Sequence, residues 1–176
     1  GITSLNTAFS SEGSFIHIPK NVQVDKPIQV IYFSTGKNES IFYQPRNLII
    51  VGENSQVEII ERHQSLSENS VLVNSVSEIY CDVRSVVKHY KIQNDKTNAS
   101  LIDNTFVSQE RNSDYSLHTF SLGGELTRNN LSILQNGERI ESTINGITII
   151  GANQHVDHNT LIPVSYTHLR AHETYD

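Results

Sequence analysis

The feature that most constrains the fold is a unit of strand, polar turn and strand that recurs along the chain. An apolar or aromatic residue lies three places after each turn, and successive members are 33, 30, 28 and 25 positions apart: Val24, Val57, Val87, Tyr115 and Ile140. The turns are Pro19-Lys20-Asn21, Gly52-Glu53-Asn54, Asp82-Val83-Arg84, Arg111-Asn112 and Asn136-Gly137. A period of roughly 20–50 residues is typical of repeat architectures, so a stack of similar units is expected.

The content of each unit selects among these architectures. The units contain strands and no apolar stripe of helical period, which argues against leucine-rich, ankyrin and helical-hairpin repeats, and propeller blades need about 40 residues each. A right-handed parallel β-helix fits best, because stacked rungs bury a continuous core that one rung cannot bury alone. An antiparallel β-sandwich or jelly roll stays open as the alternative, since Asn136-Gly137 and Asn145-Gly146 are hairpin-type signals.

Short strand-like segments account for most of the chain, which is therefore predicted to be all-β. They are rich in β-branched and aromatic residues and are bounded by Asn, Gly, Asp and Ser: residues 15–18, 28–33, 48–51, 57–60, 86–92 and 144–150. Side chains alternate between the two faces of a strand. This alternation predicts that the following residues point inward: Val57, Ile59, Val87, Tyr115, Leu117, Ile140 and Ile144.

Charge and cysteine content limit the partners and the compartment. Lys and Arg number 13 against 19 Asp and Glu, a formal net charge of −6. An acidic chain without a basic cluster argues against nucleic acid and anionic membrane as partners, and no apolar run reaches the roughly 20 residues that span a bilayer. The single cysteine, Cys81, cannot form an internal disulfide, so a soluble cytoplasmic protein with a structural cysteine is expected.

Five long blocks follow one another in an order that resembles a known family. They are LNTAFSSEGSFIHIPKNVQVDK (5–26), QPRNLIIVGENSQVEIIERHQS (44–65), YKIQNDKTNASLIDNTFVSQERNS (90–113), GGELTRNNL (123–131) and NQHVDHNTLI (153–162). Together they resemble the core of the SufB/SufD family of iron–sulfur cluster assembly scaffold proteins, closer to the SufD member. The resemblance covers residues 5–162 and implies a right-handed β-helix core.

The resemblance implies a non-enzymatic assembly factor. A SufD-like protein pairs with a SufB-like homologue on a dimer of a SufC-like ATPase, and the complex builds a nascent iron–sulfur cluster for acceptor proteins. In the family, a Cys-x-Ser stretch and a nearby His follow the Val-Asp-His segment, whereas a different tail follows it here. The family's helical N-terminal region and its SufC-contacting helices are also expected to be absent. No catalytic or cofactor-binding residue is therefore assigned, and this fragment alone is expected to bind no cofactor.

The C-terminal tail is set apart from the fold. From Val164 the chain reads Val-Ser-Tyr-Thr-His-Leu-Arg-Ala-His-Glu-Thr, which looks like the translation of a transposase adapter used for sequencing libraries. Residues 163–176 are therefore treated as non-native and residues 1–162 as a core truncated at both ends, with a genuine basic tail as the alternative. Without residues 164–176 the charge balance is 12 against 17, a net charge of −5.

One cluster is a candidate metal site. His155, Asp157 and His158 carry imidazole and carboxylate groups that suit iron or zinc, and His155 and Asp157 share one strand face. His158 is expected on the other face, which weakens a site of three ligands. The pattern lacks a specific metal-binding spacing, so a structural role along the rungs is favoured over the hypothesis of a metal site.

The remaining charged segments are interpreted as surface. Glu61-Arg62-His63 and Lys88-His89-Tyr90 are predicted to form solvent-facing rows, and Gly123-Gly124 to turn a corner, since no phosphate-loop pattern follows it.

Two other functions stay open beside the scaffold. A β-helix carbohydrate-active enzyme, a polysaccharide lyase or glycosidase, would need grouped carboxylates on an outer face, and the charges here are spread out. A structural solenoid is the third class.

Overall fold

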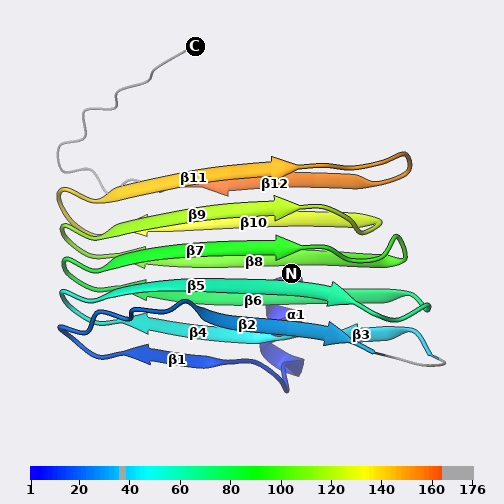
Figure 1. Ribbon diagram of the computed structural model, residues 1–176, viewed down its shortest axis with the longest axis horizontal. Coiled ribbons are helices and arrows are strands. Elements are labelled where there is room, and N and C mark those ends of the chain that lie inside the picture. The colour runs from blue at the N-terminus through cyan, green and yellow to red at the C-terminus, as the bar shows by residue number, and fades with distance from the viewer. Residues whose placement is uncertain (36–38, 164–176) are drawn as a thin grey trace, which may run out of the picture.

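The computed structural model describes residues 1–35 and 39–163, and strands dominate these ranges (Figure 1). Within them, a single helix, α1 (Ile2–Phe9), precedes the strands. The strands are β1 (Phe15–Ile18), β2 (Ile28–Ser34), β3 (Ile41–Tyr43), β4 (Arg46–Val51), β5 (Gln56–Ser65), β6 (Val71–Cys81), β7 (Val86–Gln93), β8 (Ala99–Gln109), β9 (Asp114–Ser121), β10 (Leu126–Gln135), β11 (Glu141–Thr148) and β12 (His155–Leu161).

Two sheets face each other along a stack of rungs (Figure 1). One has the order β1-β4-β6-β8-β10-β12, with β3 also paired to β6, and the other has the order β11-β9-β7-β5-β2. Every strand pair recorded between these strands is parallel. The predicted parallel β-helix is therefore confirmed, and the antiparallel sandwich is wrong. Asn145-Gly146 lies inside β11 and forms no hairpin.

The predicted turns stack on one another at one edge of the solenoid. Asn21, Asn54, Arg84 and Asn112 adopt positive φ angles of 56–62°. The backbone N–H group of each of these residues donates to a backbone carbonyl of the next rung, for example Asn21 N to Glu53 O at 2.8 Å and Asn54 N to Val83 O at 2.9 Å. Asn reaches this left-handed region more readily than most residues, which explains why it recurs at the corners.

The fifth turn is displaced from its predicted position. The left-handed residue is Arg139, with a φ of 56°, and not a member of Asn136-Gly137. Ser142 pairs with Tyr115, so Ser142 and not Ile140 continues the column. Gly137 serves a close approach, because a Cβ there would lie 3.0 Å from the Arg111 backbone. A glycine needed for space was taken for the turn anchor.

The apolar core fills the space between the sheets. The predicted inward residues of β5, β7 and β9 are all at most 5% exposed, which confirms them: Val57, Ile59, Val87, Tyr115 and Leu117. Ile144 pairs with Leu117 but is 40% exposed, because β11 is the last strand of its sheet among the described residues. Ile140, which lies in the corner before β11, is only half-buried.

The helix α1 lies against the outer side of β6 through a polar contact. The buried Asn6 amide donates to Pro45 O at 3.1 Å and to Asn74 O at 2.8 Å. The apolar side chains of Ile2, Leu5 and Phe9 are 40–67% exposed. The sequence pattern predicts no helix here, because the 8 residues of α1 are too few for three turns of apolar periodicity.

The backbone at Arg139 generates a prediction about stability. Arg139 is exposed and no side-chain contact of it is recorded, so Arg139→Gly removes only the cost of a left-handed L-residue. We expect the free energy of unfolding to rise by about 0.5–1 kcal/mol, because that cost exceeds the extra chain entropy of glycine. Arg139→Val is expected to lower it by about 1 kcal/mol or more, since a β-branched side chain fits this region worst. Equal denaturation midpoints for the two variants would contradict this account.

Candidate functional site

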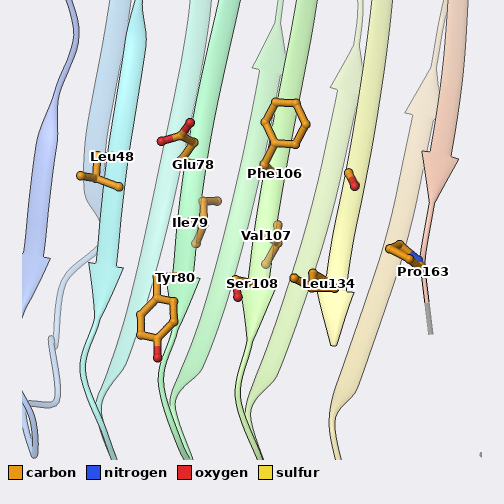
Figure 2. A pocket seen from close by; sticks show the side chains of 10 residues that line it. Leu48, Glu78, Ile79, Tyr80, Phe106, Val107, Ser108, Leu134 and Pro163 are labelled. Atoms are coloured by element: carbon orange, nitrogen blue, oxygen red, sulfur yellow. The ribbon is translucent and has the colours of Figure 1, made fainter. Parts of the chain in front are cut away.

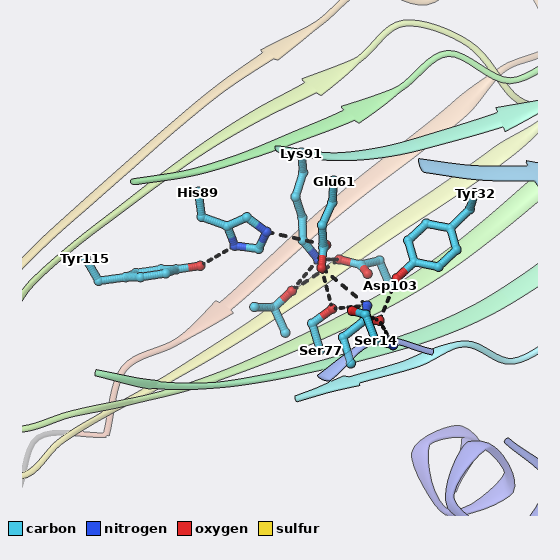
Figure 3. A network of polar contacts seen from close by, with 10 residues as sticks. Ser14, Tyr32, Glu61, Ser77, His89, Lys91, Asp103 and Tyr115 are labelled. Atoms are coloured by element: carbon cyan, nitrogen blue, oxygen red, sulfur yellow. Dashed lines mark hydrogen bonds and ion pairs between the residues drawn. The ribbon is translucent and has the colours of Figure 1, made fainter. Parts of the chain in front are cut away.

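A cluster of ionisable side chains lies inside the solenoid and is called here the interior cluster. Its members are Glu61 of β5, His89 and Lys91 of β7, Asp103 of β8 and Tyr115 of β9, all between 0% and 8% exposed (Figure 3). Carboxylates and lysines are almost never fully buried unless they are paired. The interior cluster is therefore the most chemically distinctive feature of the described residues.

The register of the parallel strands assembles one side of the interior cluster. Glu61 pairs with Lys91 across β5 and β7, and Ile59 pairs with His89. Because side chains alternate between the two faces of β5, Glu61 faces inward together with Val57 and Ile59. Asp103 comes from β8 in the opposite sheet, so the cluster joins the two sheets across the interior (Figure 3).

The Lys91 ammonium group is the centre of the charged contacts. Its Nζ lies 2.5 Å from Asp103 Oδ2 and 3.2 Å from Glu61 Oε2, and it donates to Thr105 Oγ1 at 2.6 Å. The second carboxylate oxygen of Glu61 accepts from Ser77 Oγ at 3.0 Å. Two carboxylates thus share one ammonium group in a water-poor interior, where each charge requires its partner.

A second branch of the interior cluster leads from Glu61 to Tyr115. His89 Nε2 lies 3.4 Å from Glu61 Oε2, and His89 Nδ1 lies 2.9 Å from the Tyr115 hydroxyl group. Beside this branch, His63 stacks on Tyr32, with ring centroids 4.7 Å apart. Both ring nitrogens of His63 are buried, and no hydrogen-bond partner is found for either within the described residues.

These surroundings shift the ionisation of several groups. Burial alone would raise the pKa of Glu61, but the Lys91 charge and the His89 ring lower it well below its usual value. Burial would lower the pKa of Lys91, but Asp103 and Glu61 raise it. Burial lowers the pKa of His63 despite the nearby carboxylates. Near neutral pH, Glu61 and Lys91 are therefore charged and His63 is neutral.

Several of these residues face the opposite side from the one that the sequence predicts. Glu61, His63 and His89 were predicted to face solvent, yet they are at most 5% exposed, so that prediction is wrong. The alternation from Val57 and Val87 already indicated the inward side for these positions. The prediction of solvent-facing rows followed instead the general expectation that charged groups lie on the surface.

The candidate metal residues occupy the last described strand. Asp157 forms an ion pair of 3.1 Å with Arg128. The ring nitrogens of the next residue, His158, lie 3.4 Å from Asn129 Nδ2 and 3.2 Å from Thr148 Oγ1. His155 is exposed. Among the residues that the structure describes, no group of three or more His, Cys, Asp or Glu side chains is arranged to hold a metal ion.

Cys81 and the tail complete the predicted features. Cys81 is fully buried, and burial, with a smaller contribution from Asp114, raises the pKa of its thiol to about 12. The thiol is therefore protonated and unreactive at neutral pH.

The predicted adapter-like tail falls on residues 164–176, outside the described residues. In the described ranges, no helix has the length and apolar character needed to cross a membrane.

The fold and the interior cluster define a class, a parallel β-solenoid whose two sheets are joined inside by ionic contacts. The family model described as the SUF system iron–sulfur cluster assembly SufBD core domain matches residues 32–176, and the SufBD N-terminal region model matches residues 1–30. The chain belongs to the SufBD family. The match to residues 1–30, which include α1, corrects the expectation that the N-terminal region is absent altogether.

Several curated relatives support this assignment. An iron–sulfur cluster assembly SufBD family protein of Synechocystis is 30% identical, over 94% of this chain and 38% of its own. The iron–sulfur cluster assembly protein SufB of Bacillus subtilis is 30% identical, over 88% of this chain and 33% of its own. The chloroplastic protein ABCI7 of Arabidopsis thaliana is 31% identical, over 76% of this chain and 30% of its own. The chain spans about a third of the length of these relatives.

The ion pairing of Lys91 generates a prediction about stability. Lys91→Met leaves Glu61 and Asp103 as unpaired buried carboxylates and is expected to lower the free energy of unfolding by about 3–5 kcal/mol. The matched control is Lys88→Met, on the outer side of the same strand, where Lys88 pairs with Glu58 at 3.0 Å. Because the side chains of Lys88 and Glu58 are 43% and 33% exposed, water screens this pair and the variant should unfold close to wild type. Equal losses in the two denaturation curves would contradict the assigned role of Lys91.

His63 generates a prediction about pH. Its pKa is lower in the folded protein than the ordinary value of 6.5, so below about pH 6.5 the unfolded chain binds a proton that the folded chain does not. Stability should therefore fall as the pH decreases from about 7 to about 5, before Glu61 begins to contribute near its ordinary value of 4.5. His63→Phe keeps a ring against Tyr32 and should flatten this slope in urea unfolding. An unaltered slope in His63→Phe would refute the assignment.

Proposed function

We propose that this chain is part of a scaffold subunit of an iron–sulfur cluster assembly complex of the SufBCD type. It acts by contact with a SufB-like subunit and a SufC-like ATPase, and it is not itself an enzyme. Membership of the SufBD family supports a role in iron–sulfur assembly. The iron–sulfur cluster is cargo of the whole complex, and this stretch holds no part of it alone.

The burial of the interior cluster is the observation that carries the non-enzymatic part of the proposal. Tyr115, His89 and Glu61 form an acid–base relay that would suit catalysis on an accessible surface. His89 and Tyr115 have no exposed surface and Glu61 is 1% exposed, so a polymeric substrate such as a polysaccharide cannot reach the relay. The relay therefore supports a structural interior, and function falls to the outer faces of the solenoid.

The outer faces have the character of protein-contact surfaces. Large apolar side chains point outward from both sheets, including Phe106 at 40% exposed, Leu134 at 44% and Ile147 at 53%. Large exposed apolar patches are typical of protein–protein contacts and of ligand-binding grooves. We place the complex in the cytoplasm, in keeping with a single, buried, unpaired cysteine.

Co-purification from cells tests this proposal. The full-length protein is co-expressed with a tagged SufC-like ATPase and a SufB-like subunit, and all three are expected to elute together and to yield the visible absorption of an iron–sulfur cluster. Omitting the SufB-like subunit should abolish the absorption, because the cluster belongs to the complex. Failure of the subunits to associate, or cleavage of oligosaccharides by the isolated protein, would overturn the proposal.

A further inference from the structure

An apolar groove crosses the outer face of the sheet that contains β4, β6, β8 and β10 (Figure 2). It has a volume of about 460 Å³. One wall follows the register row from Leu48 of β4 to Phe106 of β8, and the other follows the row from Tyr80 of β6 to Leu134 of β10. These four side chains are 37–44% exposed. The groove is thus built by strand register and does not depend on a loop.

The size of the groove indicates the kind of segment it fits. It crosses four strands spaced about 4.8 Å apart, which gives a length of about 14 Å. A helix rises 1.5 Å per residue, so about ten residues of helix match this length. Ser132 lies beside Phe106 in one row, and Ser108 lies beside Leu134 in the other, so each row has a small side chain next to a large one. Apolar side chains at helical spacing can therefore enter between the walls.

The charged residues around the groove indicate the charge that a bound segment would carry. Glu78 is the only carboxylate among its lining residues, and it is already paired with Arg46, so it does not by itself select an occupant. At the end where β6 and β8 finish, Asp82 and Glu110 follow directly. Burial and these two carboxylates raise the pKa of the Tyr80 phenol. An apolar groove bordered by carboxylates favours a segment with Lys or Arg beside its apolar face.

The chain itself shows how this sheet face receives a helix. Arg46 Nη1 donates to Asn6 Oδ1 at 3.3 Å and to Thr7 Oγ1 at 3.0 Å, both on α1. Arg46 Nη2 forms an ion pair with Glu78, which lines the groove. One arginine thus connects a docked helix to the groove, so the groove continues an interface that already exists.

We propose that this groove binds a basic amphipathic helical segment of a partner protein. The apolar face of the segment lies between the Leu48–Phe106 and Tyr80–Leu134 walls, and its basic side chains pair with Glu110 and Asp82. The proposal rests on the proposed function, because Phe106 and Leu134 are among the outward apolar side chains that support protein contact there.

Binding of synthetic peptides tests the proposal. The probe is a fluorescent amphipathic peptide of leucine and lysine, about 14 residues long so that it can form a helix. It is compared with a scrambled peptide of the same composition, which has the same charge but no apolar face. We expect the amphipathic peptide to bind at least about tenfold more tightly, because only it buries a continuous apolar surface. Equal affinities of the two peptides would overturn the proposal.

Variants of the protein locate the binding. Phe106→Ser with Leu134→Ser should weaken the amphipathic peptide by about tenfold or more. The matched control, Phe33→Ser, removes an aromatic side chain that is 54% exposed on the opposite sheet and should leave affinity unchanged. Asp82→Asn with Glu110→Gln should reduce both the affinity and its salt dependence. Loss of binding in Phe33→Ser, or a change from dimer to monomer in the Phe106/Leu134 variant, would refute a partner segment as the occupant.

Discussion

The in-register pairing of parallel strands is the constraint on which the rest of the structure depends. It places each inward side chain directly over its counterpart in the next rung, so residues form columns that cross the sheet. The column Val57, Val87 and Tyr115 is apolar or aromatic, whereas the column that contains Glu61 and Lys91 places opposite charges side by side. A slip of one residue in β5 would move Glu61 to solvent and Arg62 inside, so the register is strongly specified.

The interior cluster adds a second constraint, across the solenoid. The apolar columns alone accept small shifts between the two sheets, since dispersion contacts have little direction. Lys91 from β7 must instead meet Asp103 and Thr105 of β8 at hydrogen-bond distance. Buried ion pairs add little net stability compared with apolar packing, but leaving one partner alone is costly. The interior cluster therefore restricts which arrangements of the sheets can form at all.

The sequence predicted the repeating parts of this molecule well and the exceptions poorly. The period and the Asn-rich corners indicated a parallel solenoid, because each rung repeats the same local geometry. Arg139 escaped because Gly137 has the residue type of a turn anchor, although close approach to Arg111 requires it for another reason. Asp103 could not be assigned to Lys91, because the alignment of opposite sheets depends on corner lengths that one sequence leaves open. Side-chain alternation along β5 and β7 indicates that Glu61 and His89 face inward, but the general expectation that charged groups lie on the surface predicts the opposite.

The same alternation also separates what the two sides of a strand can do. In β8, Asp103, Thr105 and Val107 face the interior, while Phe106 between them lines the outer groove. Adjacent residues thus face either the interior of the solenoid or its outer surface. Because a change at Phe106 leaves the inward columns in place, the outer faces of such a solenoid can differ between relatives that keep the same interior. A solenoid scaffold can thereby acquire distinct partners without a change of fold.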